Sequence, residues 1–299
     1  MISVVIPLYN KEHSIRATID SVLGQTCKDF EVVVVDDGST DDSASVVKEC
    51  ARFDSRVRLI EKGNGGVSSA RNEGIRQAKY ELIAFLDADD VWEPDYLETL
   101  WKLYCDFPNA GIWGLGWGWM KNGNRSYPSF PGMENDSRGM VSSVWEKGLI
   151  YWTSSSSSSS KTLLMEIGMF DERISHGEDT DVWIKLLMQR GGAFHNTPKA
   201  FYQLDAENRA MNRNIPLEKL YIYYFEKYET WRKENASFRH FIDKECMWWL
   251  FPYYLSDSHN SDVHRILNQI DLKEYKFSFR FRFAFPRLYS LLKRVRAVK

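Results

Sequence analysis

The stretch ELIAFLDADDVW, residues 81–92, decides the fold of this chain. Its first six residues form a short, mostly apolar run, which is typical of a strand that is buried on both faces of a sheet. Three acids, Asp87, Asp89 and Asp90, follow at the point where this strand should end. Carboxylates crowded at the edge of a core cost free energy unless a cation or hydrogen bonds offset their charge. The stretch therefore predicts a buried strand that opens directly onto a polar site.

Further apolar runs of the same kind come earlier in the chain, at residues 2–6, 30–35 and 57–60. The segments between the runs have apolar residues at helical spacing, in residues 13–25, 41–53 and 67–79. This alternation predicts βαβ units, and hence an α/β fold with a Rossmann-like, mostly parallel sheet covered by helices on both faces. Ligands bind beyond the carboxyl ends of the strands in such sheets, so the residues after each strand are the candidates for function.

The composition excludes some classes of protein. The chain has 299 residues and a net charge of −2, which argues against general nucleic-acid binding. Its four cysteines lie far apart, without metal-ligand spacing, and suit reduced thiols. The N-terminal run has no basic leader and predicts a strand, and no apolar stretch approaches the roughly 20 residues that span a bilayer. We therefore expect a cytoplasmic protein.

Polar or glycine-rich sequence follows each of the four predicted strands. The four loops read PLYNKE (7–12), DDGSTDD (36–42), EKGNGG (61–66) and DADD (87–90). Because the carboxyl ends of parallel strands share one edge of the sheet, we expect these loops to lie together. Their agreement is a stronger signal than any one of them.

The DADD loop has two interpretations. Carboxylates at its alternate positions, Asp87 and Asp89, can converge on a hard divalent cation such as Mg²⁺ or Mn²⁺. Alternatively, the loop is an acidic turn in which Asp90 caps a helix that starts near Pro94. The second strand offers a similar choice: we expect Asp37 to accept hydrogen bonds from a ligand and the later acids of that loop to cap the next helix.

The other two candidate loops also have structural alternatives. The segment GNGGVSSARNEG, residues 63–74, lacks the spacing of a dinucleotide fingerprint, but its glycines allow a ligand to approach the backbone. Arg71 could bind phosphate or form a surface ion pair. Glu178 and Asp179 begin a predicted helix, where acids favour the helix dipole or could supply a general base.

The rest of the chain predicts a helix at residues 93–107 and a strand at 110–119, followed from about residue 215 by long helical sequence. The final segment, residues 275–299, has eight Lys or Arg residues from Lys276 onward and no acid. Phenylalanines at alternate positions of residues 277–285 predict a strand, and a basic amphipathic stretch follows Pro286. This tail could contact an anionic membrane surface, or it could be solvated or covered by a partner.

Taken in order, the motifs resemble glycosyltransferase family 2, which has the GT-A fold. They are SVVIPLYNKE, VVVVDDGSTDDS, NGGVSSARNEGI, FLDADD, IGMFDE and GEDTDVW, and they extend over roughly residues 1–205. The resemblance implies a GT-A domain at residues 1–210, with a nucleotide-binding half (1–106) and an acceptor-binding half (107–210). Residues 211–299 would then be a helical extension that ends in the basic aromatic tail.

The resemblance also implies an inverting transfer of a sugar from a nucleotide diphosphate donor, usually a UDP-sugar. It places Pro7 and Tyr9 against the nucleotide base and gives Asp37 a hydrogen bond to that base. Asn64 and Arg71 would lie beside the base and the ribose–diphosphate region. The acceptor would be a saccharide or a lipid-linked saccharide of a surface polysaccharide pathway.

The remaining roles follow from the family's acidic motifs. Asp87 and Asp89 match its Asp-x-Asp pair, so Asp87 would lie near the ribose and Asp89 would hold Mn²⁺ or Mg²⁺ on the diphosphate. Asp179 matches the catalytic base, and Glu178 would help to place the acceptor. The serine run at 154–160 falls where the family has a small-residue strand, so we expect it to be ordered.

Two other functions are considered beside this one. A sugar nucleotidyltransferase would need a glycine-rich, basic triphosphate loop after the first strand, which PLYNKE does not supply. A catalytically inactive nucleotide-sugar binder would have lost its base, whereas Asp179 is in place.

Overall fold

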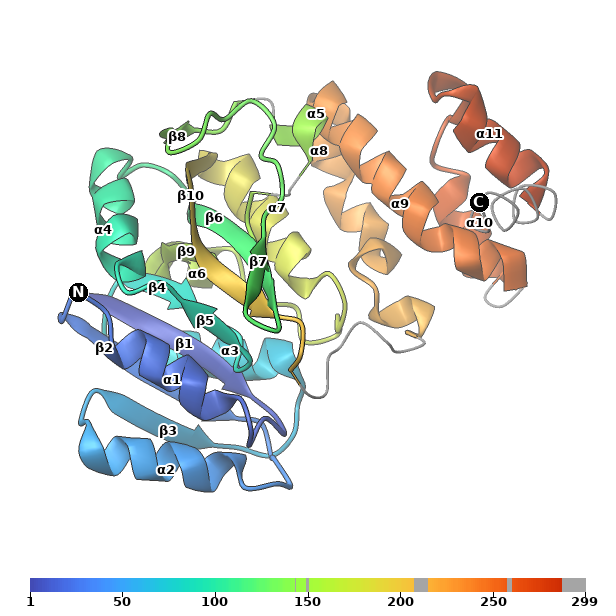
Figure 1. Cartoon of the computed structure of the whole chain (residues 1–299). Helices are drawn as coiled ribbons and strands as arrows, with labels where there is room; N and C mark the ends of the chain where they lie inside the picture. The colour runs from blue at the N-terminus through green and yellow to red at the C-terminus, as the bar shows by residue number, and fades with distance from the viewer. Residues whose placement is uncertain (143, 149–150, 207–214, 257–259, 287–299) are drawn as a thin grey trace. The chain divides into compact units, whose positions relative to one another are not determined.

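The computed structural model describes residues 1–142, 144–148, 151–206, 215–256 and 260–286 (Figure 1). The chain divides into two compact units, residues 1–214 and residues 215–299. The boundary expected from the sequence, between residues 210 and 211, lies outside the described residues.

The first unit is built on one sheet. Its strands are β1 (Ile2–Leu8), β2 (Phe30–Asp36), β3 (Val57–Glu61), β4 (Leu82–Phe85), β5 (Asp90–Trp92), β6 (Ile112–Lys121), β7 (Asn124–Ser126), β8 (Arg138–Met140), β9 (Ser157–Ser160) and β10 (Gly192–Gln203). In the described residues the sheet order is β3-β2-β1-β4-β9-β6-β10-β5, with β7 beside β6 and β8 beside β10. The first four strands in this order are parallel, β6 and β10 run the same way, and β9 and β5 are antiparallel to their neighbours.

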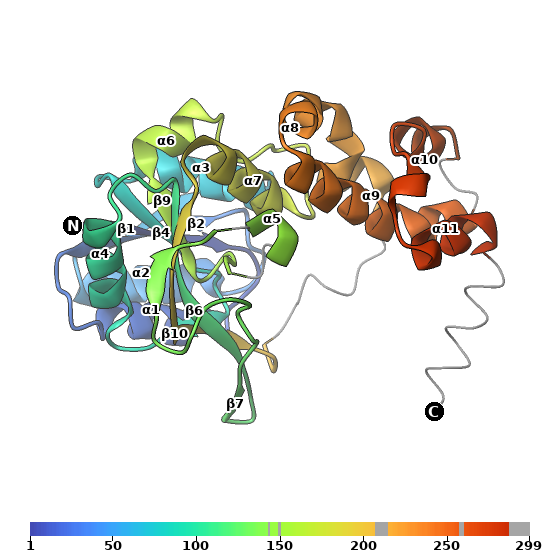
Figure 2. The same ribbon diagram turned by 90° about the horizontal axis from the view of Figure 1, so that it is seen from above.

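Helices cover both faces of this sheet. They are α1 (Ile15–Leu23), α2 (Ser43–Phe53), α3 (Val67–Gln77), α4 (Tyr96–Asp106), α5 (Val144–Lys147), α6 (Lys161–Glu166) and α7 (Glu178–Arg190). Figure 2 shows α1 and α2 on one face and α3 and α7 on the other. The strands β1, β2 and β4 are almost wholly buried between these layers, which is why they read as continuous apolar runs. The α/β class with a mostly parallel sheet is confirmed.

Two short strands lie between the segments expected from the sequence. The second part of the serine run, Ser157–Ser160, forms β9 between β4 and β6, and residues 154–159 are buried, so the expectation of an ordered segment is confirmed. The residues from Asp90 to Trp92 form the strand β5, where the sequence predicted only a loop and the start of a helix. It pairs with the distant β10, a partner that local sequence does not reveal.

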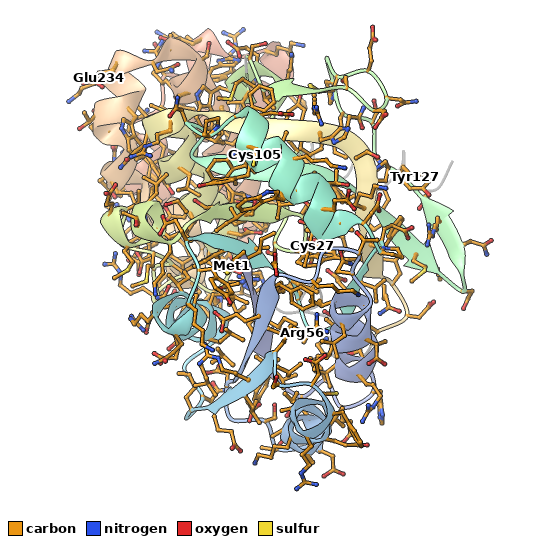
Figure 3. All side chains as sticks on the ribbon, turned by 90° about the vertical axis from the view of Figure 1, so that its left-hand side faces the viewer. Met1, Cys27, Arg56, Cys105, Tyr127 and Glu234 are labelled. Carbon is orange, nitrogen blue, oxygen red and sulfur yellow. The ribbon has the colours of Figure 1, made fainter. Side chains whose placement is uncertain are left out.

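The cysteines are spread over separate elements. Cys27 lies in the loop after α1 and Cys105 lies on α4 (both are labelled in Figure 3). Cys50 and Cys246 lie on α2 and on helix α9 (Ala236–Ser256), and all four are unpaired thiols in the structure.

The second unit is helical. Its elements are the 3-10 helices η2 (Leu217–Lys219), η3 (Tyr221–Tyr228) and η4 (Leu272–Glu274), and the α-helices α8 (Glu229–Glu234), α9, α10 (Asn260–Leu267) and α11 (Phe277–Ala284). The helical extension expected from the sequence is therefore confirmed. Its first part is less regular than expected, because Tyr224 has non-helical backbone angles and η3 kinks there.

The strand expected at residues 277–285 is wrong, because this segment is the helix α11. The contacts that this segment makes with α9 favour a helix, and they outweigh the preference for a strand that the alternating phenylalanines suggested. Phe283 packs edge-on against Phe251 and Tyr254 of α9, and the Arg282 guanidinium lies 3.8 Å from the centre of the Phe251 ring. The basic stretch after Pro286 lies outside the described residues.

Candidate active site

Loops after three parallel strands are tied to one another at one edge of the sheet. The backbone N–H of Asn10, after β1, donates to Ser39 Oγ, after β2, at 3.0 Å. The Asn10 side chain in turn accepts from the Thr40 N–H at 2.8 Å. Asn10 has a left-handed backbone with φ of 52°, a conformation that asparagine tolerates better than most residues. The expectation that the strand-end loops share one edge is therefore met by direct contacts.

Asp37 holds the third loop in place. Its side chain accepts from the backbone N–H groups of Gly65 (2.9 Å) and Gly66 (2.7 Å), and it pairs with Lys62 Nζ at 2.7 Å. Gly66 has a φ of 89°, which a side chain would strain. The carboxylate is buried, so in this structure its partners come from the loop itself. A contact from Asp37 to a nucleotide base stays a prediction.

Three of the other expected nucleotide-binding residues lie at the same edge. Pro7 is partly buried near the end of β1, and Tyr9 follows the strand with 43% of its surface exposed. Asn64 is exposed in the loop held by Asp37. Their roles toward a nucleotide stay predictions, but all three lie next to the strand ends, where a ligand of this fold binds.

Arg71 joins the two halves of the site. It lies on α3 and is only 2% exposed. One guanidinium nitrogen donates to Asp87 at 2.8 Å and the other donates to Glu178 at 2.8 Å. The alternative of a surface ion pair is therefore wrong, because the pair is buried. Burial opposes the charge of Arg71, but the carboxylates of Asp87, Glu178 and Asp179 raise its pKa above the ordinary value.

The three acids after β4 have different partners. Asp87 pairs with Arg71, and Asp89 pairs with Lys11, whose Nζ lies 2.7 Å from Asp89 Oδ2. Burial raises the pKa of Asp89, and the Lys11 ammonium opposes that rise. Asp90 is buried and accepts hydrogen bonds from Ser155 Oγ and the Gln203 N–H.

The role expected for Asp90 at a helix start is wrong. Asp90 begins β5, and the residue before α4 is Asp95. Burial, together with the charges of Asp87 and Asp89, raises the pKa of Asp90 well above its usual range. Such a group belongs to the sheet interior, where it joins β5 to β10 and to the segment before β9, and not to a solvent-exposed helix end.

The acidic pair at the start of α7 faces the same site. Glu178 is buried, and burial together with Asp179 raises its pKa to about 7, while Arg71 opposes that rise. Asp179 is partly exposed, and one of its oxygens accepts from the Thr180 N–H at 2.6 Å. Of the two carboxylates, Asp179 is thus the more accessible to an acceptor hydroxyl.

The serine run contributes two side chains that the sequence did not assign to the site. Ser154 Oγ donates to Asp179 Oδ2 at 3.1 Å. Ser155 Oγ accepts from the Asp87 N–H at 3.1 Å and donates to Asp90. The run therefore contacts both the acids after β4 and the acidic pair of α7. The signal for this role was its position just before IGMFDE, in the small-residue strand of the family that it resembles.

The residues present fit a divalent cation held together with a phosphate ligand. Among the described residues, no three His, Cys, Asp or Glu side chains converge as a metal cage. Mg²⁺ and related ions are usually bound through one or two carboxylates plus substrate phosphates. Asp89 and the nearby Asp87 would supply these one or two carboxylates.

A separate pocket in the helical unit is less suited to a ligand. It has a volume of about 450 Å³ and is lined by charged side chains that include Arg232, Asp243 and Glu229. Arg232 is buried and pairs with both acids, at 3.0 Å to Asp243 and 2.7 Å to Glu229. These charges satisfy one another, so we base no function on this pocket.

Solved structures share the fold. The chain resembles the crystal structure of Staphylococcus aureus TarS residues 1–349 in complex with UDP-GlcNAc, with a TM-score of 0.63 and 21% identity. That likeness covers 85% of this chain and 72% of the TarS chain. The same TarS fragment in complex with UDP matches with a TM-score of 0.58 and 20% identity, over 89% of each chain. At this level of identity the likeness establishes the fold.

Relatives and a family description identify the N-terminal part. GlyA of Streptococcus pneumoniae, named a glycosyltransferase, is 43% identical over 106 residues, which are 36% of this chain and 15% of GlyA. The uncharacterized glycosyltransferase EpsJ of Bacillus subtilis is 44% identical over 90 residues, which are 30% of this chain and 26% of EpsJ. The matches thus span about a quarter or less of each of these relatives. Residues 3–143 match the family described as Glycosyl transferase family 2. With this match, its acidic motifs and its fold in agreement, the N-terminal region at residues 3–143 is a glycosyltransferase family 2 domain.

Proposed function

We propose that this chain transfers a sugar from a nucleotide diphosphate donor, with a UDP-sugar favoured, to a hydroxyl group of a saccharide or lipid-linked saccharide. One observation carries this proposal. The acids after β4 and the acidic pair of α7 come from segments about 90 residues apart, yet Arg71 contacts one acid of each group at 2.8 Å. The acids that we propose for the donor site and for the base are thus adjacent in space but come from different elements, which supports the proposal.

This arrangement suits inversion. In an in-line displacement the acceptor oxygen attacks the anomeric carbon on the side opposite to the diphosphate. Asp179 takes the proton from the attacking hydroxyl, the new C–O bond forms, and the bond to the diphosphate breaks with its electron pair leaving on the phosphate oxygen. Asp89, with Asp87, would hold Mn²⁺ or Mg²⁺, and such a cation neutralises charge on the departing diphosphate when it is bound. No covalent nucleophile is needed.

Ser154 and Glu178 support the base in this proposal. The hydrogen bond from Ser154 orients one oxygen of Asp179, and that oxygen keeps a lone pair for the acceptor proton. Glu178 is held by Arg71 and would position the acceptor rather than compete for its proton. The proposal thereby assigns separate tasks to two neighbouring carboxylates.

The decisive experiment separates donor binding from transfer. Asp179→Asn should lower transfer at least about a thousandfold while UDP-sugar affinity changes less than about threefold, because the amide cannot accept the proton. Asp89→Ala should instead weaken the binding step, measured as the affinity for UDP in the presence of Mn²⁺. Asp41→Asn is the matched control, at an acid of the second loop whose side chain accepts from the Ser43 N–H at the start of α2. Near-normal turnover in Asp179→Asn would assign the base to another residue, and absence of any Mn²⁺-dependent nucleotide binding would overturn the transferase proposal.

We further propose that the protein works in the cytoplasm at the inner face of the cell membrane. Among the described residues, no helix is both long enough and apolar enough to cross a bilayer. The rings of Phe277 and Phe281 in α11, and of Phe285 directly after it, form a row of tilted contacts with centres 5.9 and 5.3 Å apart. Phe277 and Phe285 are 69% and 56% exposed. An aromatic stripe beside a basic segment favours peripheral contact with an anionic lipid surface.

A further inference from the structure

Among the described residues, Lys11 is the one residue of the first strand-end loop that forms an ion pair with an acid after β4. Its Nζ lies 2.7 Å from Asp89 Oδ2, and the two side chains are 12% and 19% exposed. A pair so shielded from water is stronger than a typical surface ion pair. It also occupies an oxygen of the carboxylate that the proposed function gives to the metal.

The backbone around Lys11 is firmly held. Its N–H donates to Ser43 Oγ at 2.8 Å, and the preceding residue, Asn10, is tied to Ser39 and Thr40. The loop therefore fixes where the side chain begins. The four-carbon stem of lysine remains able to move its ammonium group to a nearby anion.

The two carboxylates of the DADD loop that are proposed to face the donor each pair with a different cationic side chain in this structure. Asp87 is paired with Arg71, and Asp89 is paired with Lys11. A divalent cation that arrived alone would meet two neutralised carboxylates and the repulsion of the ammonium group. A nucleoside diphosphate changes this balance, because its oxygens ligate the cation and also attract the lysine.

We propose, on the basis of the function proposed above, that Lys11 is the built-in counter-ion of Asp89 in the donor-free protein and makes cation binding depend on the nucleotide. A divalent cation binds tightly only together with a nucleoside diphosphate, which draws Lys11 away from the carboxylate. Lys11 thus sets the order in which the site fills. It is a positioning residue, because it acts through Asp89.

The test measures Mn²⁺ affinity of the full chain, by titration followed by electron paramagnetic resonance, with and without UDP. Lys11→Met keeps the length of the side chain and removes its charge. Without UDP, Mn²⁺ should bind about tenfold more tightly to this variant than to the unchanged protein, since a nearby positive charge is gone. The gain in Mn²⁺ affinity on adding UDP should shrink correspondingly. Lys11→Arg keeps the charge and should behave as the unchanged protein.

Lys199→Met is the matched control. Lys199 pairs with Asp95 at 2.8 Å, a lysine–aspartate pair that involves none of the acids of the DADD loop. Its loss should leave Mn²⁺ affinity unchanged. Equal Mn²⁺ affinity of Lys11→Met and Lys199→Met without UDP would overturn the inference while the proposed function stands. If the unchanged protein bound no Mn²⁺ even with UDP, the proposed function would fail and the inference with it.

Discussion

Arg71 illustrates what a single residue contributes to this site. Its guanidinium is buried, stacks 5.3 Å from the centre of the Phe170 ring and pairs with both Asp87 and Glu178. A buried charge is tolerated only when it is paired and hydrogen bonded. The three groups therefore depend on one another, and removal of the cation leaves the buried Glu178 and the partly buried Asp87 without their partner.

Arg71→Met should consequently lower the free energy of unfolding by about 3–5 kcal/mol at pH 8, as measured by urea denaturation. Arg173→Met, which removes an exposed arginine paired with Asp171, should cost less than about 1 kcal/mol. If both variants were equally stable, the buried pair would not contribute as argued.

The loss in free energy of unfolding that Arg71→Met causes, called the deficit below, should also depend on pH. In the folded protein the pKa of Glu178 is raised to about 7, above its ordinary value, so folding favours the protonated carboxyl and stability falls as pH rises toward 7. Without Arg71 this pKa rises further, because the cation no longer opposes it. The deficit should therefore be small at pH 5.5 and grow as pH rises through 7. A deficit that stayed constant from pH 5.5 to 8.5 would contradict this account.

At the scale of elements, the middle of the sheet depends on the close approach of β6 to the segment before β9. A Cβ at Gly114, in β6, would lie 2.5 Å from Trp152 Cδ1 and 3.3 Å from Phe194. Trp152 is buried at 3% exposure, so it has little room to move. The absence of a side chain at Gly114 thus allows Trp152 to pack and β9 to enter the sheet beside β6.

Gly114→Ala should therefore lower the free energy of unfolding by about 1–3 kcal/mol, the usual cost of an overpacked core. Gly139→Ala is the control, since Gly139 is also in a strand, β8, and a Cβ there would meet nothing within 4 Å. Urea denaturation of the two variants measures the difference. Equal stability would mean that Trp152 can shift without cost.

At the scale of the whole molecule, the candidate active site and the candidate membrane contact belong to different units. The sheet unit carries the site, whereas the helical unit has exposed aromatic side chains at Phe277 and Phe285, within a segment (276–299) that has eight Lys or Arg and no acid. Helical geometry puts Phe277, Phe281 and Phe285 on one stripe, at intervals of four residues. The helix thereby concentrates on one face the aromatic surface that an interfacial contact requires.

The double substitution Phe277→Ser with Phe285→Ser should weaken binding to phosphatidylglycerol vesicles about tenfold or more, because two exposed rings no longer enter the interface. Sedimentation with vesicles measures this, and phosphatidylcholine vesicles should bind the unchanged protein weakly. Phe53→Ser alters a residue of α2 that is 83% exposed, and it should have no effect. Undiminished binding of the double variant would exclude α11 as the contact.

The sequence by itself determined the βαβ half of this protein. Strands that are buried on both faces must be apolar throughout. The helices that cover them must have apolar residues every three to four positions, so both kinds of element can be predicted from the local sequence pattern. The same logic placed the strand-end loops on one edge and put Glu178 and Asp179 at the start of α7. These features depend on neighbours along the chain.

Only the tertiary structure decided which partner each charged group takes. Arg71 meets Glu178 across 107 positions of sequence, Lys11 meets Asp89 across 78, and Asp90 is buried by its contact with Ser155, 65 positions away. The helix α11 is likewise chosen by its packing on α9 rather than by the alternation of its phenylalanines. Local periodicity records which face of an element is apolar, but it carries no information on what that face will meet. For this reason the clustering of the strand-end loops followed from the sequence, whereas the pairing of their charges did not.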